Sequence, residues 1–345
     1  MNVLGIESSC DETAAAVVQD GKKILSSVVA TQIPFHQAYQ GVVPEIASRK
    51  HTEWILPVVR RCLSEAGMTL SDVDAVAATN RPGLMGSLLV GLTFAKTLAY
   101  AAGKPFVAVN HMHGHMYSAH LESDIEYPYL GLLVSGGHSI IARVSSFDDF
   151  DVLGTTIDDS VGEAFDKVAK FYGMGYPGGA VIDRLARGGS PDAARFPMPD
   201  LSKGDHRYDV SFSGLKTAAI HQLEQFWSEG FERTDENLAA AFQEAACRIL
   251  VSRLERAVRD TGLSTVVAGG GVAANSRLRQ MLSGLEGVRC VFPPLSLCGD
   301  NGAMIAGVAY HFLRRGDRSG WDTSASARVE AFRRGLRALA LAGRR

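Results

Sequence analysis

The sequence lacks most of the features that would mark a secreted, membrane or strongly basic nucleic-acid-binding protein. Its 345 residues hold only five cysteines, none in Cys-x-x-Cys spacing, so we expect no disulfide framework or zinc ribbon and a reducing, cytoplasmic location. The formal net charge is −2, so bulk charge gives no reason to expect nucleic-acid binding. The longest apolar tract, 84–102, is interrupted by Ser87, Thr93 and Lys96, which predicts a buried helix and no membrane contact.

The charge that is present is unevenly distributed. From Arg314 onward there are nine arginines against three acidic residues, a net +6, which leaves −8 on the rest of the chain. Such a basic end is typical either of a solvated surface or of a segment that contacts phosphate groups, and the sequence leaves both open. The chain is long enough for two domains with separate cores.

Histidine is concentrated in one place. Four of the ten histidines fall within residues 110–120, directly after a short apolar run that predicts a buried strand. Asn110 is a favoured N-cap residue, so we expect a helix to begin at His111. Residues four apart share a helix face, so His111 and His115 can bind one ion, whereas His113 should point away. A polar helix face without a metal is the alternative reading of His-x-x-x-His alone.

Strands and helices alternate along the chain, and one theme occurs twice. Apolar runs predict strands at 3–7, 14–18, 24–30, 73–79, 106–109, 130–134, 139–144 and 265–268, and helices at 44–66, 84–102, 238–257 and 303–313. Two of these strand pairs flank turns of small or polar residues, at 8–13 and at 135–138. The repeat predicts two related α/β domains. Both turns suit ligand binding through backbone N–H groups, although ordinary turns would have the same composition.

Acidic residues gather between positions 158 and 167, at the expected start of a helix. Asp158 and Asp159 are explained by the preference for acidic residues in a first helical turn, whereas Asp166 lies deeper and is a better candidate for binding hydroxyl groups. Further on, three glycines at 269–271 lie between a strand and a helix. They would let a flat ring lie on the backbone, which is a weak indication of nucleotide binding.

A metal site with open positions would need a third ligand. Asp300, in a turn before the last apolar helix, is the candidate to join His111 and His115, and two histidines with one carboxylate are typical of a catalytic metal. A zinc peptidase would carry a glutamate general base at position 112, where this chain has Met112. A sugar-kinase-like or actin-like ATPase would suit the duplicated domains but needs no histidine-bound ion.

Taken together and in order, these segments resemble the bacterial TsaD family. The matching segments are residues 5–13, 44–51, 111–115, 133–138, 158–167, 176–179, 211–217, 269–275 and 299–302. The resemblance implies an α/β, duplicated actin/Hsp70-like (ASKHA) two-domain fold with a central cleft. We expect one domain at 1–122, a second at 123–298, and a C-terminal part, 299–345, that returns a helix to the first domain and ends in the basic tail.

The resemblance also implies an activity. It implies transfer of the threonylcarbamoyl group from L-threonylcarbamoyl-adenylate to N6 of the adenosine at position 37 in tRNAs that read ANN codons. It implies one divalent ion per subunit, Fe²⁺ or Zn²⁺, and leaves Mg²⁺ with a bound nucleotide open. It implies a TsaB-like paralogue and a TsaE-like ATPase as partners. The alternative functions are an ATP-binding actin/Hsp70-like module and, less favoured, a metallopeptidase.

The family's functional positions can be carried over residue by residue. His111, His115 and Asp300 match the metal ligands, and Asp11 and Glu12 match an acidic loop near the acyl transfer. The positions that contact the substrate are Val134, Ser135, Gly136, Gly137, His138, Asp166, Gly179, Asp183 and Asn275. Because a tRNA backbone requires positive charge, we also expect contributions from Arg49, Lys50, the loop 203–207 and the tail arginines.

Overall fold

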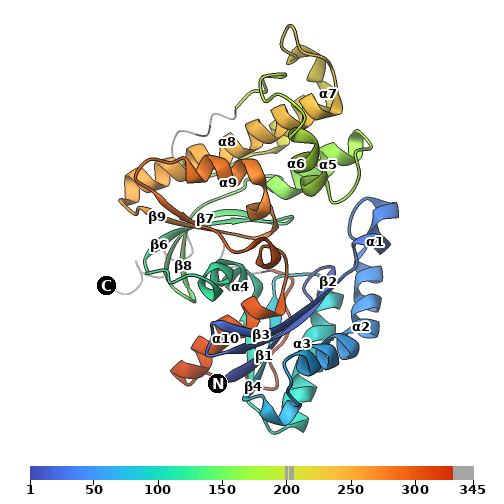
Figure 1. Cartoon of the computed structure of the whole chain (residues 1–345), viewed down its shortest axis with the longest axis vertical. Helices are drawn as coiled ribbons and strands as arrows, with labels where there is room; N and C mark the ends of the chain where they lie inside the picture. Colours follow the sequence, from blue (N-terminus) through green and yellow to red (C-terminus); the bar gives the residue numbers. More distant parts are fainter. Residues whose placement is uncertain (199–200, 202–205, 329–345) are drawn as a thin grey trace. The chain divides into compact units, whose positions relative to one another are not determined.

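The computed structural model describes residues 1–198, 201 and 206–328, and these residues form two compact units (Figure 1). The first unit consists of Met1–Ile125 and of the segment that begins at Pro293, and the second consists of Glu126–Phe292. From the sequence, these two changes of domain are expected after residues 122 and 298. Among the described residues, no helix has both the length and the hydrophobicity that a membrane span requires.

The first unit is built on a five-stranded sheet in the order β3-β2-β1-β4-β5. Three strands form an antiparallel meander, and two more continue the sheet parallel to its first strand. The strands are β1 (Asn2–Glu7), β2 (Glu12–Gln19), β3 (Lys23–Thr31), β4 (Ala75–Arg81) and β5 (Phe106–Asn110). The helices are α1 (Ile33–His36), α2 (Pro44–Glu65), α3 (Met85–Ala101), α4 (His111–Tyr117) and α10 (Gly302–Arg315).

Both faces of this sheet are covered by helices. Alternate strand residues such as Leu4 and Ile6 pack with Ile55 of α2 and Leu92 of α3 in one buried core, and burying each such side chain contributes about 1.5–3 kcal/mol. On the opposite face α10 lies directly on β1. A β-carbon on Gly5 would come within 2.3 Å of the carbonyl oxygen of Gly302, so only glycine allows this approach. The start of α10 is thereby fixed against the centre of the sheet.

The second unit repeats this architecture. Its sheet has the order β10-β9-β6-β7-β8, again a three-stranded antiparallel meander continued by two parallel strands. The strands are β6 (Tyr129–Val134), β7 (Ser139–Ser146), β8 (Asp149–Thr155), β9 (Thr265–Gly269) and β10 (Arg289–Val291). The helices are α5 (Val161–Phe171), α6 (Gly178–Ala186), α7 (Ser213–His221), α8 (Asp235–Thr261) and α9 (Ser276–Ser283).

The duplication predicted from the sequence is therefore confirmed strand by strand, since β1 to β5 correspond in order and direction to β6 to β10. Two strands were not predicted. β8 carries Asp149 and Asp151 and only one fully buried side chain, Val152, so it lacks the apolar pattern of a core strand. β10 has only three residues, with a single buried side chain, which is too short for any pattern to be visible.

The interpretation of Asp158 and Asp159 as first-turn residues was wrong. α5 begins only after its N-cap, Ser160, and both aspartates precede it. Asp158 instead accepts hydrogen bonds from the backbone N–H of Phe212 (2.8 Å) and Ser213 (3.3 Å) at the start of α7. Asp159 forms ion pairs with the lysines of α5 and α7. The two carboxylates therefore join α5 to α7, a contact between segments more than 50 residues apart.

Candidate functional site

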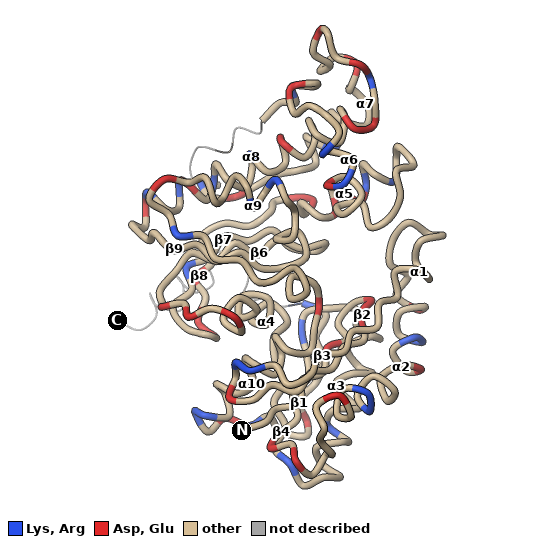
Figure 2. The backbone as a smooth tube through the Cα atoms, viewed as in Figure 1, with Lys and Arg blue, Asp and Glu red and all other residues tan. Residues whose placement is uncertain are grey.

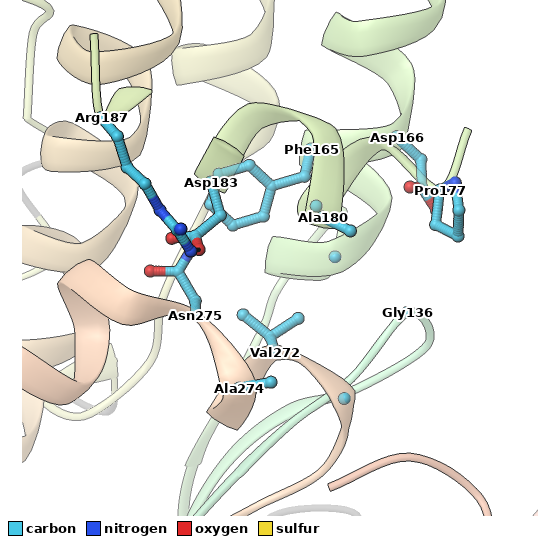
Figure 3. Close-up of a pocket in the computed structure, with 13 residues that line it drawn as sticks. Gly136, Phe165, Asp166, Pro177, Ala180, Asp183, Arg187, Val272, Ala274 and Asn275 are labelled. Carbon is cyan, nitrogen blue, oxygen red and sulfur yellow. Dashed lines mark hydrogen bonds and ion pairs between the residues drawn. The ribbon is translucent and has the colours of Figure 1, made fainter. Parts of the chain in front are cut away.

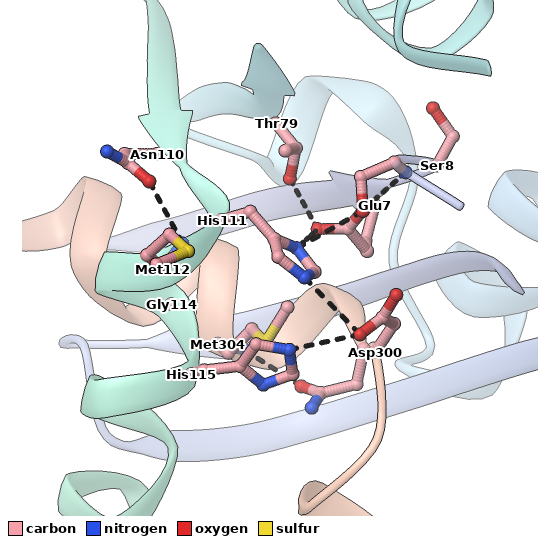
Figure 4. Close-up of polar contacts among 12 residues, drawn as sticks. Glu7, Ser8, Thr79, Asn110, His111, Met112, Gly114, His115, Asp300 and Met304 are labelled. Carbon is pink, nitrogen blue, oxygen red and sulfur yellow. Dashed lines mark hydrogen bonds and ion pairs between the residues drawn. The ribbon is translucent and has the colours of Figure 1, made fainter. Parts of the chain in front are cut away.

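The predicted histidine pair lies at the carboxyl end of β5, where the strand turns into α4 (Figure 4). The side-chain oxygen of Asn110 accepts a hydrogen bond from the backbone N–H of Met112 at 2.9 Å, so the predicted N-cap is confirmed. The rings of His111 and His115 lie on one face of α4 with their centroids 4.4 Å apart. Both histidines are buried, so neither belongs to a polar surface.

Asp300 reaches these histidines from the turn before α10. Asn301 caps α10 by accepting a hydrogen bond from the backbone N–H of Met304 (2.9 Å), which fixes the turn. The Oδ1 atom of Asp300 lies 3.1 Å from Nε2 of His115 and 3.5 Å from Nε2 of His111. The ligand atoms of a tetrahedral zinc site lie about 3.3 Å apart, close to both distances from Asp300, and the three candidate ligand atoms all lie within 4.8 Å of one another, so the group suits a shared ion.

The nitrogen atoms of His115 provide a second test of fit. Both are buried, and neither forms a hydrogen bond of normal geometry within the described residues. Burial, together with the neighbouring His111, lowers the pKa of His115, so its imidazole is neutral. A neutral imidazole with an unsatisfied buried nitrogen beside a carboxylate is a suitable metal ligand.

A further carboxylate, that of Glu7, contacts His111 through its Nδ1 atom. No role was predicted for Glu7 from the sequence. Its Oε2 atom lies 2.9 Å from Nδ1 of His111 and accepts a hydrogen bond from Oγ1 of Thr79 at 2.5 Å, while Oε1 accepts from the backbone N–H of Ser9 at 2.5 Å. Because a carboxylate only accepts, Nδ1 of His111 carries the proton and Nε2 faces Asp300.

The electrostatics of this group are dominated by burial and by opposite charges. Burial alone would raise the pKa of Glu7, but His111 outweighs it and the pKa is lowered, so the carboxylate is charged. Burial would lower the pKa of His111, but Asp300 and Glu7 together raise it to about 9. Without an ion the ring therefore carries a proton on both nitrogens, and a bound ion would take the place of the proton on Nε2. A charged residue ending an otherwise apolar strand was the only sequence signal for Glu7.

The acidic pair predicted to lie near the reaction is in the same unit. Asp11 is buried in the turn between β1 and β2, and Glu12 is the first residue of β2. Burial raises the pKa of Glu12 well above its usual range, and the charges of Asp11 and Asp300 raise it further. Glu12 is thus close enough to Asp300 to respond to its charge.

The second unit contains a cavity of about 460 Å³, the size of a small-molecule site (Figure 3). Of the nine predicted substrate residues, five line it, namely Gly136, Asp166, Gly179, Asp183 and Asn275. The other four belong to the end of β6 and the turn after it, and are not among the residues that line this cavity: Val134, Ser135, Gly137 and His138. The side chain of Val134 is fully buried, so only its backbone could meet a ligand.

Three polar residues of the cavity also hold its walls together. Asp166 accepts a hydrogen bond from the backbone N–H of Gly178 at 2.7 Å, which joins α5 to the start of α6. Asp183 accepts from the N–H (2.9 Å) and Oγ (2.7 Å) of Ser276. Asn275 caps α9 through its oxygen and donates through its nitrogen to Gln243 of α8 at 2.8 Å. These residues therefore fix the position of the cavity walls.

Gly179 differs from its neighbour Gly178 in the space around it. A β-carbon there would meet only Cβ of Phe165, at 4.0 Å, whereas at Gly178 it would come within 2.6 Å of the backbone of α5. Packing within the protein thus requires glycine at 178 but not at 179. A side chain at 179 would lie at the wall of the cavity, where it would take space from a ligand.

The basic residues expected to contact tRNA are largely paired with acidic ones. Arg49 and Lys50 each form an ion pair with a glutamate of α2 (2.7 and 2.6 Å), and Figure 2 shows both signs of charge along this helix. Arg207 pairs with an aspartate of α8 at 2.7 Å. Lys203 and the tail from residue 329 lie outside the described residues. Exposed pairs of this kind are weak, so they could exchange partners for phosphate groups.

Comparison with known proteins identifies the family. The sequence model described as TsaD, tRNA N6-adenosine threonylcarbamoyltransferase, matches residues 23–307. A protein of that name from Treponema denticola is 68% identical over 96% of this chain and 98% of its own length. The protein of the same name from Treponema pallidum (strain Nichols) is 58% identical over 96% and 94%, respectively.

Solved structures agree on the fold. Full-length HypF, in its phosphate- and nucleotide-bound form, matches with a TM-score of 0.61 at 15% identity, over 90% of this chain and 55% of HypF. Component A of (R)-2-hydroxyglutaryl-CoA dehydratase from Acidaminococcus fermentans matches with a TM-score of 0.53 at 17% identity, over 90% and 98%. The predicted duplicated fold of the actin/Hsp70 type is confirmed, while its central cleft stays a prediction. On the sequence evidence, this chain belongs to the TsaD family of tRNA N6-adenosine threonylcarbamoyltransferases.

Proposed function

We propose that this chain transfers the threonylcarbamoyl group from L-threonylcarbamoyl-adenylate to N6 of the adenosine at position 37 in tRNAs that read ANN codons. Membership of the TsaD family supports the reaction. The observation that carries the proposal within this chain is the convergence of His111, His115 and Asp300 on one point. An ATP-binding module of the same fold would not require it.

We propose that these three residues hold one divalent ion. Two imidazoles and one carboxylate suit Fe²⁺ or Zn²⁺, and the unsatisfied Nε2 atom of His115 supports occupancy by either. When bound, such an ion supplies Lewis-acid polarisation of a carbonyl oxygen. Glu7 orients His111 so that its Nε2 atom faces the ion. Binding of Mg²⁺ together with a nucleotide stays a prediction.

The cavity of the second unit is the proposed site for the adenylate. Its size suits a nucleotide-sized ligand, and Phe165, Val272 and Ala274 give it apolar surface for a flat ring. Asp166 and Asp183 supply carboxylate oxygens for ribose hydroxyl groups. The turn 134–138 is proposed to contact the rest of the donor. Holding donor and acceptor at near-attack distance can supply about 7–11 kcal/mol of the barrier.

The chemistry needs no enzyme nucleophile, because the donor is a mixed anhydride. The N6 nitrogen attacks the carbamoyl carbonyl carbon, a C–N bond forms, and the bond from that carbon to the phosphate oxygen breaks, so that AMP leaves with the electron pair. The proton released from N6 needs an acceptor. Asp11 and Glu12 are the proposed carboxyl groups for this task.

The partners are proposed on the same family grounds. Because Arg49, Lys50 and Arg207 are each paired with an acidic residue, we propose that the basic tail or partner proteins contribute to tRNA binding. A TsaB-like paralogue and a TsaE-like ATPase are the proposed partners, and the cytoplasm is the proposed location. The alternative of a metallopeptidase is disfavoured, because Met112 is only 1% exposed and occupies the position where a general base would have to be.

The decisive experiment is direct. The purified chain and the two partner proteins are incubated with tRNA and L-threonylcarbamoyl-adenylate. The tRNA is then digested, and the masses of the nucleosides are measured by mass spectrometry. We expect adenosine to gain the mass of one threonylcarbamoyl group, and reactions without the chain or the adenylate to show no gain. ATP hydrolysis without modified adenosine would favour the ATP-binding module instead.

A further inference from the structure

His51 is a fully buried histidine of α2 that the reaction above does not use. Its imidazole spans two parts of the first unit. The Nδ1 atom lies 2.8 Å from Oγ1 of Thr13 in β2, and the Nε2 atom lies 3.0 Å from the carbonyl oxygen of Cys10 in the turn between β1 and β2. A helix outside the site thus contacts the turn that leads to Asp11.

The contacts of His51 define one protonation state. A carbonyl oxygen only accepts, so Nε2 must carry a proton. Burial lowers the pKa of His51, although the hydrogen bond to Cys10 raises it in part, and the ring is therefore neutral with Nδ1 as an acceptor. The Thr13 hydroxyl consequently donates to Nδ1. Both ring nitrogens are satisfied in this single tautomer.

The turn held by His51 contacts His111, one of the three proposed metal ligands. Two successive backbone carbonyl groups of this turn accept hydrogen bonds. The carbonyl oxygen of Ser9 accepts from the N–H of Leu84 (2.8 Å), and that of Cys10 accepts from His51 and from Oγ of Ser87 (3.3 Å). Within the same turn, Oγ of Ser9 lies 3.2 Å from Nδ1 of His111. The carbonyl bound by His51 therefore lies between a residue that contacts His111 and the acidic pair.

We propose that His51 is a positioning residue of the transfer reaction. Its neutral imidazole holds the Cys10 carbonyl, and thereby sets both the contact of Ser9 with His111 and the direction of Asp11 and Glu12. This inference rests on the proposed function, because it assigns a reaction to the acidic pair. It predicts that the turn moves when the Nε2 contact is lost and stays in place when only the Nδ1 contact is lost.

Two substitutions separate these contacts. In His51→Gln the side-chain nitrogen can take the place of Nε2 and donate to Cys10, whereas in His51→Asn the shorter amide can only reach Thr13. For His51→Asn we expect kcat to fall about 10-fold or more with KM for tRNA nearly unchanged, as for other residues that orient a metal site from outside it. For His51→Gln we expect kcat within about threefold of the natural chain, since the hydrogen bond to Cys10 is retained.

His36 provides the matched control. It is also fully buried, and its Nδ1 atom accepts from the backbone N–H of Val43 at 3.3 Å, outside the turn. His36→Asn should lower the thermal midpoint as His51→Asn does but leave kcat unchanged. If His51→Asn fails to fold, Thr13→Val decides. It removes only the Nδ1 contact, with little change in side-chain volume, so kcat should stay within about threefold of the natural chain.

The outcomes distinguish this inference from the proposed function. Equal kcat for His51→Asn and the natural chain, or an equal loss in His51→Gln and His51→Asn, would overturn the positioning role. A kcat lowered about 10-fold in Thr13→Val, which keeps the contact with Cys10, would do the same where the first variant is unfolded. A natural chain that modifies no tRNA in the presence of both partners would instead count against the proposed function.

Discussion

Glu7→Gln is the sharpest test of how the first unit prepares a metal site. The natural carboxylate accepts hydrogen bonds from Ser9, Thr79 and His111 and has no proton to donate. A glutamine amide has one accepting oxygen and one donating nitrogen, so it cannot accept from all three. At least one buried donor then loses its partner, which costs about 1–3 kcal/mol of stability.

The same change acts on the metal ligand. If the amide nitrogen faces His111, it must donate to Nδ1, and the ring proton moves to Nε2, the atom proposed to bind the ion. Replacing a residue that orients a ligand typically lowers metal affinity or activity about 10–100-fold, equivalent to about 1.4–2.8 kcal/mol. We therefore expect Glu7→Gln to lower metal affinity in this range and the rate of transfer with it.

The assay is a competition titration against a chromophoric chelator, with bound metal measured by mass spectrometry and transfer by nucleoside mass. Thr79→Val is the control, because it removes one donor to Glu7 but leaves the charge and the contact with His111 in place. We expect that variant to bind metal nearly as tightly as the natural chain. Natural metal affinity in a folded Glu7→Gln chain would refute the argument that Glu7 sets the tautomer of His111.

Three further predictions concern the ligand set, the cavity and the dependence on pH. Asp300→Ala removes the carboxylate between the two imidazoles, so bound metal and transfer should fall together while Asn301 still caps α10, as circular dichroism can check. Gly179→Val places a side chain at the cavity wall and should raise KM for the adenylate about 10-fold or more without lowering metal content, since the loss resembles overfilling a packed site. His120 titrates with a pKa lowered from 6.5 to about 4 by burial and by its neighbours His311 and Lys22, an effect that Asp124 opposes. As the pH falls below 6.5 the unfolded chain gains a proton at His120 that the folded chain does not, so stability declines toward pH 4 by up to about 3 kcal/mol. His120→Gln should flatten this decline in urea unfolding, and an unchanged slope would contradict the assignment.

Local patterns predicted the elements of the fold and part of the site. The N-cap at Asn110 and the helical spacing of His111 and His115 depend on residues within one turn of each other, and both are confirmed. The duplication was visible because two strand–turn–strand segments of similar composition occur about 125 residues apart, a spacing that reflects the same sheet order in each unit. Strand β8 was missed because its surface carries aspartates, so its pairing with β7 decides its conformation more than its own pattern does.

The sequence could not show which carboxylates cap a helix and which contact the predicted metal ligands. Asp158 and Asp300 each lie beside the start of a helix, yet one caps a distant helix and the other meets two imidazoles. Helix-terminus preferences are worth only about 0.3–1 kcal/mol, so they are easily outweighed by tertiary partners. Glu7 makes the point most clearly. A charge at the end of an apolar strand marks Glu7 as unusual, but its contact with His111 depends on the order β1-β4-β5 in the sheet, because His111 follows β5 and Thr79 of β4 donates to the same carboxylate. The role of a buried charge is therefore set by the sheet order, and only the folded chain specifies it.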